Sequence, residues 1–177
     1  KVRDVSGPDG VPDGKITPDD RDFVGNSQPS FTAGLNNTIN YKNFTLNFFI
    51  NTIQGVTKSS PLWTTFYYEY NWNHYNYDFW TESNPTNEVA ANRMNINPYG
   101  ASRYEDASFI RLKDVTLTYK FGKSITSKLG FNRLEMFVNA KNLITITDYK
   151  YGMDPEFSAY WSIPMNKTYL FGIRVSL

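Results

Sequence analysis

The sequence predicts an all-β fold, an antiparallel sheet whose strands are long enough to cross a membrane as a transmembrane β-barrel segment. Three observations lead to this prediction. Apolar residues recur at every second position in five windows, the connections between these windows are short and long in turn, and aromatic residues gather near the window ends. A barrel strand crosses the bilayer with about 9–11 alternating residues, whereas strands of soluble sheets are commonly about five or six residues long.

Residues 31–41 and 44–54 predict the first two strands, because apolar and polar residues alternate along each of them. Asn37 departs from the alternation in the first window, and Phe49 departs from it in the second. Only two residues separate the windows, which is the length of a tight hairpin turn. The apolar faces hold Phe31, Ala33, Leu35, Ile39 and Tyr41 in the first window and Phe44, Leu46, Phe48 and Ile50 in the second.

Residues 109–121, 133–143 and 168–177 predict three further strands by the same alternation. In the first of these windows the alternation slips before Val115, which indicates a β-bulge. In the second window Phe137 is out of step. The third window shows the clearest alternation, and its apolar face holds Tyr169, Phe171, Ile173, Val175 and Leu177.

The connections predict the orientation of the sheet. Residues 1–30 and the long loop 55–108 are expected to be extracellular, and residues 31–177 to carry the barrel strands, because outer-membrane barrels have short periplasmic turns and long outer loops. Five strands cannot close a barrel, since the smallest closed ones need about eight, so we expect a piece of a larger barrel. Two aromatic girdles are expected, with Tyr41, Phe44, Phe121 and Phe131 near the short turns and Phe31, Phe109, Tyr149 and Tyr151 near the long loops.

The composition excludes some classes of protein and leaves one alternative fold. A formal net charge of +1 argues against an electrostatic nucleic-acid binder. One histidine, no cysteine and no nucleophile motif predict that the chain is not an enzyme. An aromatic fraction of 17% with a mean hydropathy of −0.51 suits a barrel with a polar lumen. It also suits the alternative, a soluble aromatic-rich β-sandwich that binds carbohydrate.

The segment 62–80 is dense in aromatic residues, which are interleaved with asparagine and aspartate. Sugar rings stack on flat aromatic faces while amides and carboxylates bind sugar hydroxyls, so contact with a glycan is one interpretation. Tyrosine and tryptophan also anchor protein interfaces, and a loop of this kind can simply pack on itself. The candidate substrate- or partner-contact residues are Trp63, Trp72, His74, Tyr75 and Trp80.

The segment DGVPDGKITPDD is a candidate calcium loop, because it aligns with the ligand spacing of an EF-hand. Asp9, Asp13 and Asp20 would supply carboxylates, and Lys15 would supply its carbonyl oxygen. Val11 occupies the position of a further ligand, and the last ligand is aspartate where a longer, bidentate glutamate is usual. A structural turn cluster of Gly, Pro and Asp residues is the competing interpretation.

Four groups of residues together resemble the C-terminal end of SusC/RagA-type TonB-linked outer-membrane receptors. The resemblance covers nearly the whole chain, and the order and spacing of the groups carry it. They are Trp80 with Asn84-Pro85-Thr86-Asn87, the stretch Ser108-Phe109-Ile110-Arg111-Leu112-Lys113, Asn139 to Leu143, and Asp154-Pro155-Glu156.

The resemblance implies a bacterial outer-membrane location and a parent barrel of about twenty-two strands with an N-terminal plug. It implies import of oligosaccharides or peptides, a SusD-like surface lipoprotein as partner, and the TonB complex acting through regions outside this chain. Outer-membrane lipid would surround the wall. It further implies that the strand from Tyr169 to Leu177 is the assembly signal, although the family usually ends in an aromatic residue. Residues 4–20 also depart from the family, because Gly- and Pro-rich residues are inserted there.

Overall fold

The computed structural model describes residues 3–59, 80–86, 104–149, 154–156 and 165–177. The chain divides into two compact units, one formed by residues 1–25 and 59–104 and the other by residues 26–58 and 105–177. The second unit contains the main β-sheet. Among the described residues, no helix has the length and apolar character needed to cross a membrane.

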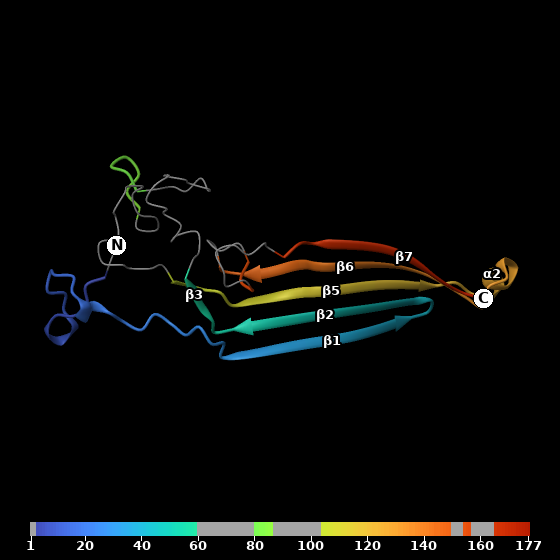
Figure 1. Ribbon diagram of the computed structural model, residues 1–177, viewed down its shortest axis with the longest axis horizontal. Helices are drawn as coiled ribbons and strands as arrows, with labels where there is room; N and C mark the ends of the chain where they lie inside the picture. Colours follow the sequence, from blue (N-terminus) through green and yellow to red (C-terminus); the bar gives the residue numbers. More distant parts are fainter. Residues whose placement is uncertain (1–2, 60–79, 87–103, 150–153, 157–164) are drawn as a thin grey trace. The chain divides into compact units, whose positions relative to one another are not determined.

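Five strands form one antiparallel sheet in the second unit, in the order β1-β2-β5-β6-β7 (Figure 1). The predicted antiparallel five-stranded sheet is therefore confirmed. The strands are β1 (Phe31–Tyr41), β2 (Phe44–Gln54), β5 (Phe109–Lys120), β6 (Arg133–Thr147) and β7 (Thr168–Ser176).

The main difference from the expected strands is at the end of β6. The sequence predicts an end at Leu143, but the strand continues to Thr147, which pairs with Phe109 at the start of β5. The apolar–polar alternation does not show this extension, because Asn142, with a positive φ of 52°, breaks the alternation within the strand. β5 and β7 each end one residue earlier than expected.

Short elements fill parts of the connections. β3 (Thr57–Ser59) pairs with β4 (Tyr104–Asp106) inside the stretch that the sequence predicts to be a long loop. Between β5 and β6 the chain forms α2 (Lys123–Thr126) and η3 (Ser127–Leu129). Gly130, in the left-handed conformation at φ 75°, ends this helical turn. In Figure 1, α2 and the end of β7 lie at the same end of the sheet as the β1–β2 hairpin.

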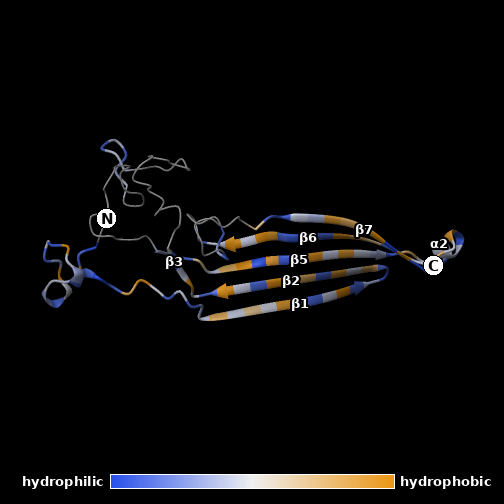
Figure 2. Ribbon diagram, viewed as in Figure 1, coloured by the Kyte–Doolittle hydropathy of each residue, from blue (hydrophilic) through white to orange (hydrophobic). Residues whose placement is uncertain are grey.

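The sheet has one polar and one apolar face, which appear as alternating colours along the strands in Figure 2. On the polar face, the Thr38 hydroxyl donates to Asn47 Oδ1 at 2.6 Å, and the Thr45 hydroxyl donates to Asn40 Oδ1 at 2.8 Å. The apolar face is exposed over all five strands in the part of the chain that the structure describes. Its exposed side chains include Leu35, Ile39, Phe44, Leu117, Val138, Ile144, Phe171 and Ile173.

A β-bulge in β5 confirms the slip that precedes Val115. The pairing of β2 with β5 moves from Phe49↔Asp114 to Ile50↔Leu112, so Lys113 is an extra residue. The pairing of β5 with β6 shifts at the same level. Since an extra residue exchanges the two faces of a strand, the odd-numbered residues are apolar-facing after the bulge and polar-facing before it.

The predicted aromatic girdle at the long-loop end is wrong for two of its four residues, Phe109 and Tyr149. Phe109 precedes the bulge, so its side chain is on the polar side and is buried, with 1% exposed. Tyr149 is also buried, in a small cluster with Val56 and Ala107. Neither residue belongs to an exposed girdle, Phe31 is exposed as expected, and Tyr151 is outside the described residues.

At the hairpin end, two of the four residues predicted for the short-turn girdle, Phe44 and Phe121, both lie against Tyr119. The rings of Phe44 and Tyr119 are 4.8 Å apart, and those of Tyr119 and Phe121 are 5.0 Å apart. Tyr41 is exposed beside them, with the Lys42 amine 5.4 Å from its ring centre. Such a row suits the level of lipid headgroups, where amphipathic rings are favoured.

The two aromatic exceptions to the alternation, Phe49 and Phe137, each cover a glycine on the neighbouring strand. Phe137 is directly opposite Gly172, where an added Cβ would be 2.4 Å from the ring. Phe49 lies over Gly34, where an added Cβ would be 3.1 Å from the ring. The rings occupy the space that larger side chains would otherwise fill.

Gly172→Ala is expected to destabilise the β6–β7 pair by about 1–3 kcal/mol, because the new methyl group overlaps a ring that the Arg174 guanidinium covers at 4.4 Å. Gly34→Ala is the matched control and is expected to cost less than about 1 kcal/mol. Urea unfolding of the full-length protein in lipid vesicles measures both. Adding Phe137→Leu should recover much of the loss, and wild-type stability of Gly172→Ala alone would contradict the overlap.

Candidate functional site

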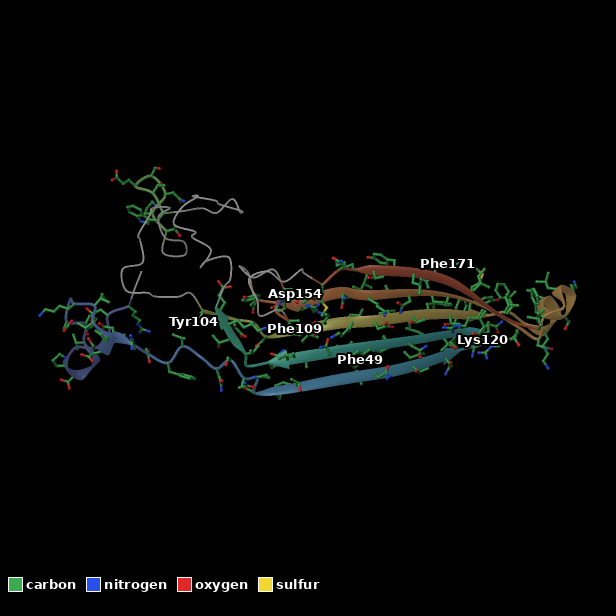
Figure 3. The ribbon with its side chains drawn as sticks, viewed as in Figure 1. Phe49, Tyr104, Phe109, Lys120, Asp154 and Phe171 are labelled. Atoms are coloured by element: carbon green, nitrogen blue, oxygen red, sulfur yellow. The ribbon has the colours of Figure 1, made fainter. Side chains whose placement is uncertain are left out.

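A buried ion cluster lies at the loop end of the sheet and joins β5 to the segment 154–156. Arg111, with only 1% of its side chain exposed, contacts Asp154 at 2.7 Å and Glu156 at 3.3 Å. Its guanidinium also lies 5.3 Å from the ring centre of Phe109. Figure 3 shows Phe109 and Asp154 at one end of the sheet and Lys120 at the other.

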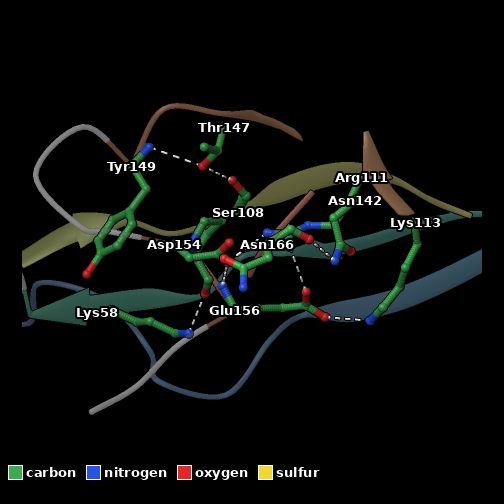
Figure 4. A network of polar contacts seen from close by, with 11 residues as sticks. Lys58, Ser108, Arg111, Lys113, Asn142, Thr147, Tyr149, Asp154, Glu156 and Asn166 are labelled. Atoms are coloured by element: carbon green, nitrogen blue, oxygen red, sulfur yellow. Dashed lines mark hydrogen bonds and ion pairs between the residues drawn. The ribbon is translucent and has the colours of Figure 1, made fainter. Parts of the chain in front are cut away.

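Two lysines complete this cluster, which we call the loop clasp (Lys58, Arg111, Lys113, Asp154 and Glu156; Figure 4). The Lys113 amine contacts Glu156 Oε1 at 2.8 Å. The Lys58 amine donates to the carbonyl oxygen of Pro155. Lys113 is the bulge residue of β5, and its side chain is on the same side of the strand as that of Arg111. The bulge therefore lets two cations of β5 meet two carboxylates that also have one residue between them.

Ser108, directly before β5, joins the start of that strand to the ends of β2 and β6. Its hydroxyl accepts from the Gly55 amide at 2.9 Å, and its carbonyl accepts from the Thr147 hydroxyl at 2.8 Å. Thr147 Oγ1 in turn accepts from the Tyr149 amide at 3.1 Å, as Figure 4 shows. The start of β5, the end of β2 and the end of β6 are thus held at one point.

Asn142 connects the same region to the last strand. Its left-handed backbone conformation, which asparagine tolerates, lets its side-chain amide donate to the carbonyl oxygen of Asn166 at 3.1 Å. Three residues earlier in β6, buried Asn139 donates to Asp114 Oδ1 at 2.9 Å and to Thr116 Oγ1 at 2.8 Å. The two asparagines therefore have different roles: Asn142 adopts the left-handed backbone conformation, and Asn139 links β6 to β5.

Burial shifts the pKa of one clasp residue, Lys58, and that of Tyr149. Burial lowers the pKa of the Lys58 amine, and the nearby Asp154 and Glu156 carboxylates oppose that shift. Burial raises the pKa of the Tyr149 hydroxyl, and the Glu105 carboxylate adds to the shift. A buried charge is stable only when paired, so the clasp holds segment 154–156 in one arrangement. It is suited to positioning a loop.

The candidate calcium residues lie in the first unit. Among the described residues, no three acidic or histidine side chains converge as metal ligands. Asp13 accepts from the Lys15 amide at 2.8 Å. Asp20 accepts from the amides of Val5 and Thr17, at 2.8 and 2.7 Å, and caps the helical turn η2 (Pro18–Asp20).

Asp9 lies in the turn η1 (Pro8–Gly10) with a positive φ of 59°. Calcium binding by Asp9, Asp13, Lys15 and Asp20 stays a prediction. Isothermal titration with calcium tests it, and no heat above buffer at millimolar metal would remove it.

The carboxylate of Asp20 is expected to stabilise the first unit over most of the pH range. Its backbone hydrogen bonds, chiefly from Thr17 and Val5, lower its pKa from 3.8 to about 2. A depressed pKa gives stability that is complete above the unfolded value, about 4, and is lost as the pH falls through about 2. NMR titration of the Val5 and Thr17 amides should show this low inflection.

Asp20→Asn should abolish that inflection. Asp22→Asn, at a carboxylate that accepts from the next backbone amide, is the matched control and should keep it. An inflection near 3.8 in the unmodified protein would contradict the bonding of Asp20.

The remaining predicted site residues are placed as follows. Trp63, Trp72, His74 and Tyr75 are outside the described residues. Trp80 is exposed and precedes a turn that Thr81 and Asn84 close with two backbone hydrogen bonds. The predicted assembly residues share the exposed apolar face at β7 and are Tyr169, Phe171, Ile173, Val175 and Leu177.

The clasp residues were not predicted as a site, although two of the stretches that carry the family resemblance contain all of them except Lys58. Arg111 and Lys113 have one residue between them, and so do Asp154 and Glu156. Matching charges at matching spacing in two separate stretches is the signal that could have joined them.

No protein-family model matches the chain. Two relatives from Formosa agariphila are similar in sequence. TonB-dependent receptor P3 is 31% identical over 144 residues, which is 81% of this chain and 14% of the relative. TonB-dependent receptor P26 is 28% identical over 154 residues, which is 84% of this chain and 16% of the relative. The chain therefore spans about a seventh of the length of these relatives.

Solved structures share the fold. The RagAB peptide importer in its open-open state matches 96% of this chain and 19% of its own, with a TM-score of 0.65 and 23% identity. A structure of the RagAB peptide transporter matches 97% of this chain and 20% of its own, with a TM-score of 0.68 and 22% identity. At 22% and 23% identity, these matches show that the fold is shared.

The amphipathic sheet and these neighbours define the fold class: the chain is a segment of an antiparallel β-barrel. The sequence relatives narrow that class. The resemblance to SusC/RagA-type TonB-linked receptors is confirmed, because relatives named as TonB-dependent receptors match over 81% and 84% of the chain.

Proposed function

We propose that the chain is the C-terminal part of a TonB-dependent outer-membrane importer of peptides or oligosaccharides. It contributes barrel wall, long extracellular loops and the strand that directs assembly. The observation that carries the proposal is the five-stranded antiparallel sheet with an exposed apolar face and an aromatic row at its hairpin end. Lipid would cover that face, whereas a soluble β-sandwich would need a second sheet packed on it.

The loop clasp supports a role for this segment at the mouth of the barrel. It fastens segment 154–156 to the polar side of β5 at the end opposite the hairpin. Short turns of such barrels are periplasmic, so the clasp end would be extracellular. A loop fixed to the inner wall there would shape the opening through which substrate enters.

Peptides are one substrate class, supported by the similarity to the RagAB peptide importer. Oligosaccharides are the other, supported by the aromatic and amide-rich composition of residues 62–80. A SusD-like surface lipoprotein and the TonB complex are the proposed partners, and the family resemblance supports both. TonB would act through regions outside this chain.

Fractionation and uptake test the proposal. The full-length protein is expected in detergent-solubilised outer membrane, and its deletion should abolish uptake of one labelled substrate class, either an oligopeptide mixture or an oligosaccharide mixture. Trp72→Ala should reduce uptake without changing barrel assembly if the aromatic loop contacts substrate. Recovery of the full-length protein in the soluble periplasm without detergent would overturn the barrel assignment.

A further inference from the structure

Positive charge is concentrated at the short-turn end of the sheet. In the stretches 41–46, 117–137 and 171–177 the sequence has six lysines and arginines and one carboxylate, Glu135, a net charge of +5. The whole chain carries +1, so all its other residues together carry −4. All six cations are exposed, and they are Lys42, Lys120, Lys123, Lys128, Arg133 and Arg174.

Three of these cations surround the buried Glu135 on the polar face. Lys120 of β5 and Arg174 of β7 are the register partners of Glu135 of β6, one on each side. Arg133 is two residues before Glu135 on the same strand and therefore on the same face. Neighbouring strands are about 4.8 Å apart, so the three cations occupy one small patch.

The two guanidiniums of this patch are held in place but not enclosed. Arg133 donates to Glu135 Oε1 from Nε at 2.9 Å and from Nη2 at 2.6 Å. Arg174 Nη1 is 3.8 Å from Glu135 Oε2, and its guanidinium stacks 4.4 Å from the ring centre of Phe137. The side chains remain 63% and 60% exposed, whereas that of Glu135 is 2% exposed.

We propose that Lys120, Arg133 and Arg174 form an anion-binding site that takes a carboxylate or phosphate group. Glu135 and Phe137 position the guanidiniums, and one carboxylate neutralises only one of three charges. Oriented guanidinium forks bind carboxylates and phosphates with paired hydrogen bonds. The patch is on the polar face, opposite the lipid-facing side, so the anion comes from within the barrel. It is either a carboxylate of a protein segment in the lumen or a dissolved anion.

The reactivity of the arginines towards phenylglyoxal tests the site in the full-length protein in detergent, with mass spectrometry as readout. Exposed Arg21 is the reference. If a protein carboxylate fills the site, Arg133 and Arg174 should react about tenfold more slowly than Arg21, as expected for a charge-assisted bond of more than about 1.4 kcal/mol. Sodium chloride at about 1 M should remove this protection, because it screens ion pairs.

If the anion is dissolved, both arginines should react as fast as Arg21, and millimolar inorganic phosphate should slow them. Fast reaction that phosphate leaves unchanged, or slow reaction that salt does not relieve, would overturn the proposal. Arg174→Gln should remove the protection of Arg133, whereas Lys128→Gln, the same charge change in the neighbouring turn, should not. The inference rests on the proposed barrel, but its failure would leave fractionation and uptake unchanged.

Discussion

Replacing Arg111 with methionine is expected to lower the free energy of unfolding by about 3–5 kcal/mol, the usual cost of breaking a buried ion pair. Methionine keeps most of the aliphatic volume but leaves Asp154 and Glu156 without their buried cation. Removing one partner of such a cluster costs more than the cluster contributes, because the other charges stay desolvated. Urea unfolding of the full-length protein in lipid vesicles measures the loss.

Lys113→Met is the matched control, because it removes a cation from the same strand and the same acidic partner. Lys113 is 36% exposed, so its loss is expected to cost about 0–1 kcal/mol. Hydrogen exchange at the Glu156 amide, which donates to Asp154, should accelerate in the Arg111 variant. Equal and small effects of both substitutions would contradict the buried clasp.

Replacing Leu35 with arginine is expected to destabilise the assembled barrel by about 2–4 kcal/mol, because a cation would then face the middle of the bilayer. Leu35 is near the centre of β1 on the exposed apolar face, opposite Ile50. Asn36→Arg is the control at the same depth on the polar face and is expected to cost about 0–1 kcal/mol. Refolding midpoints in lipid vesicles compare the two.

The opposite ranking, or equal costs, would show that the apolar face of β1 is not in contact with lipid. Repeating the pair in detergent separates lipid contact from strand pairing. In detergent micelles the penalty at Leu35 should fall, because water and headgroups approach a cation more easily there.

Strand alternation predicts most of the sheet because each face meets a different environment. Two of the five strands, 31–41 and 44–54, have the bounds that alternation predicts, and the slip before Val115 indicates the bulge at Lys113. The predicted exposure of Phe109 was wrong because of this bulge. The extra residue exchanges the faces, and alternation alone does not tell which residues precede the exchange.

Contacts between distant stretches could not be predicted from single windows. The exceptions Phe49 and Phe137 are explained only by register, which places each ring over a glycine of another strand. The clasp likewise joins Arg111 to Asp154 across 43 residues. The spacing of its charges is visible in the sequence, but no periodicity connects the two stretches.

The most direct test of the membrane-spanning sheet is a single-cysteine spin-label scan of β1 and β7, for which the chain is suited because it contains no cysteine. Labels at Leu35, Ile39 and Ile173 should be reached by oxygen dissolved in lipid. Labels at Asn36, Thr38 and Arg174 should be reached by a water-soluble nickel complex. Collision rates that alternate with a period of two residues would confirm a wall between lipid and water, and equal access on both faces would contradict it.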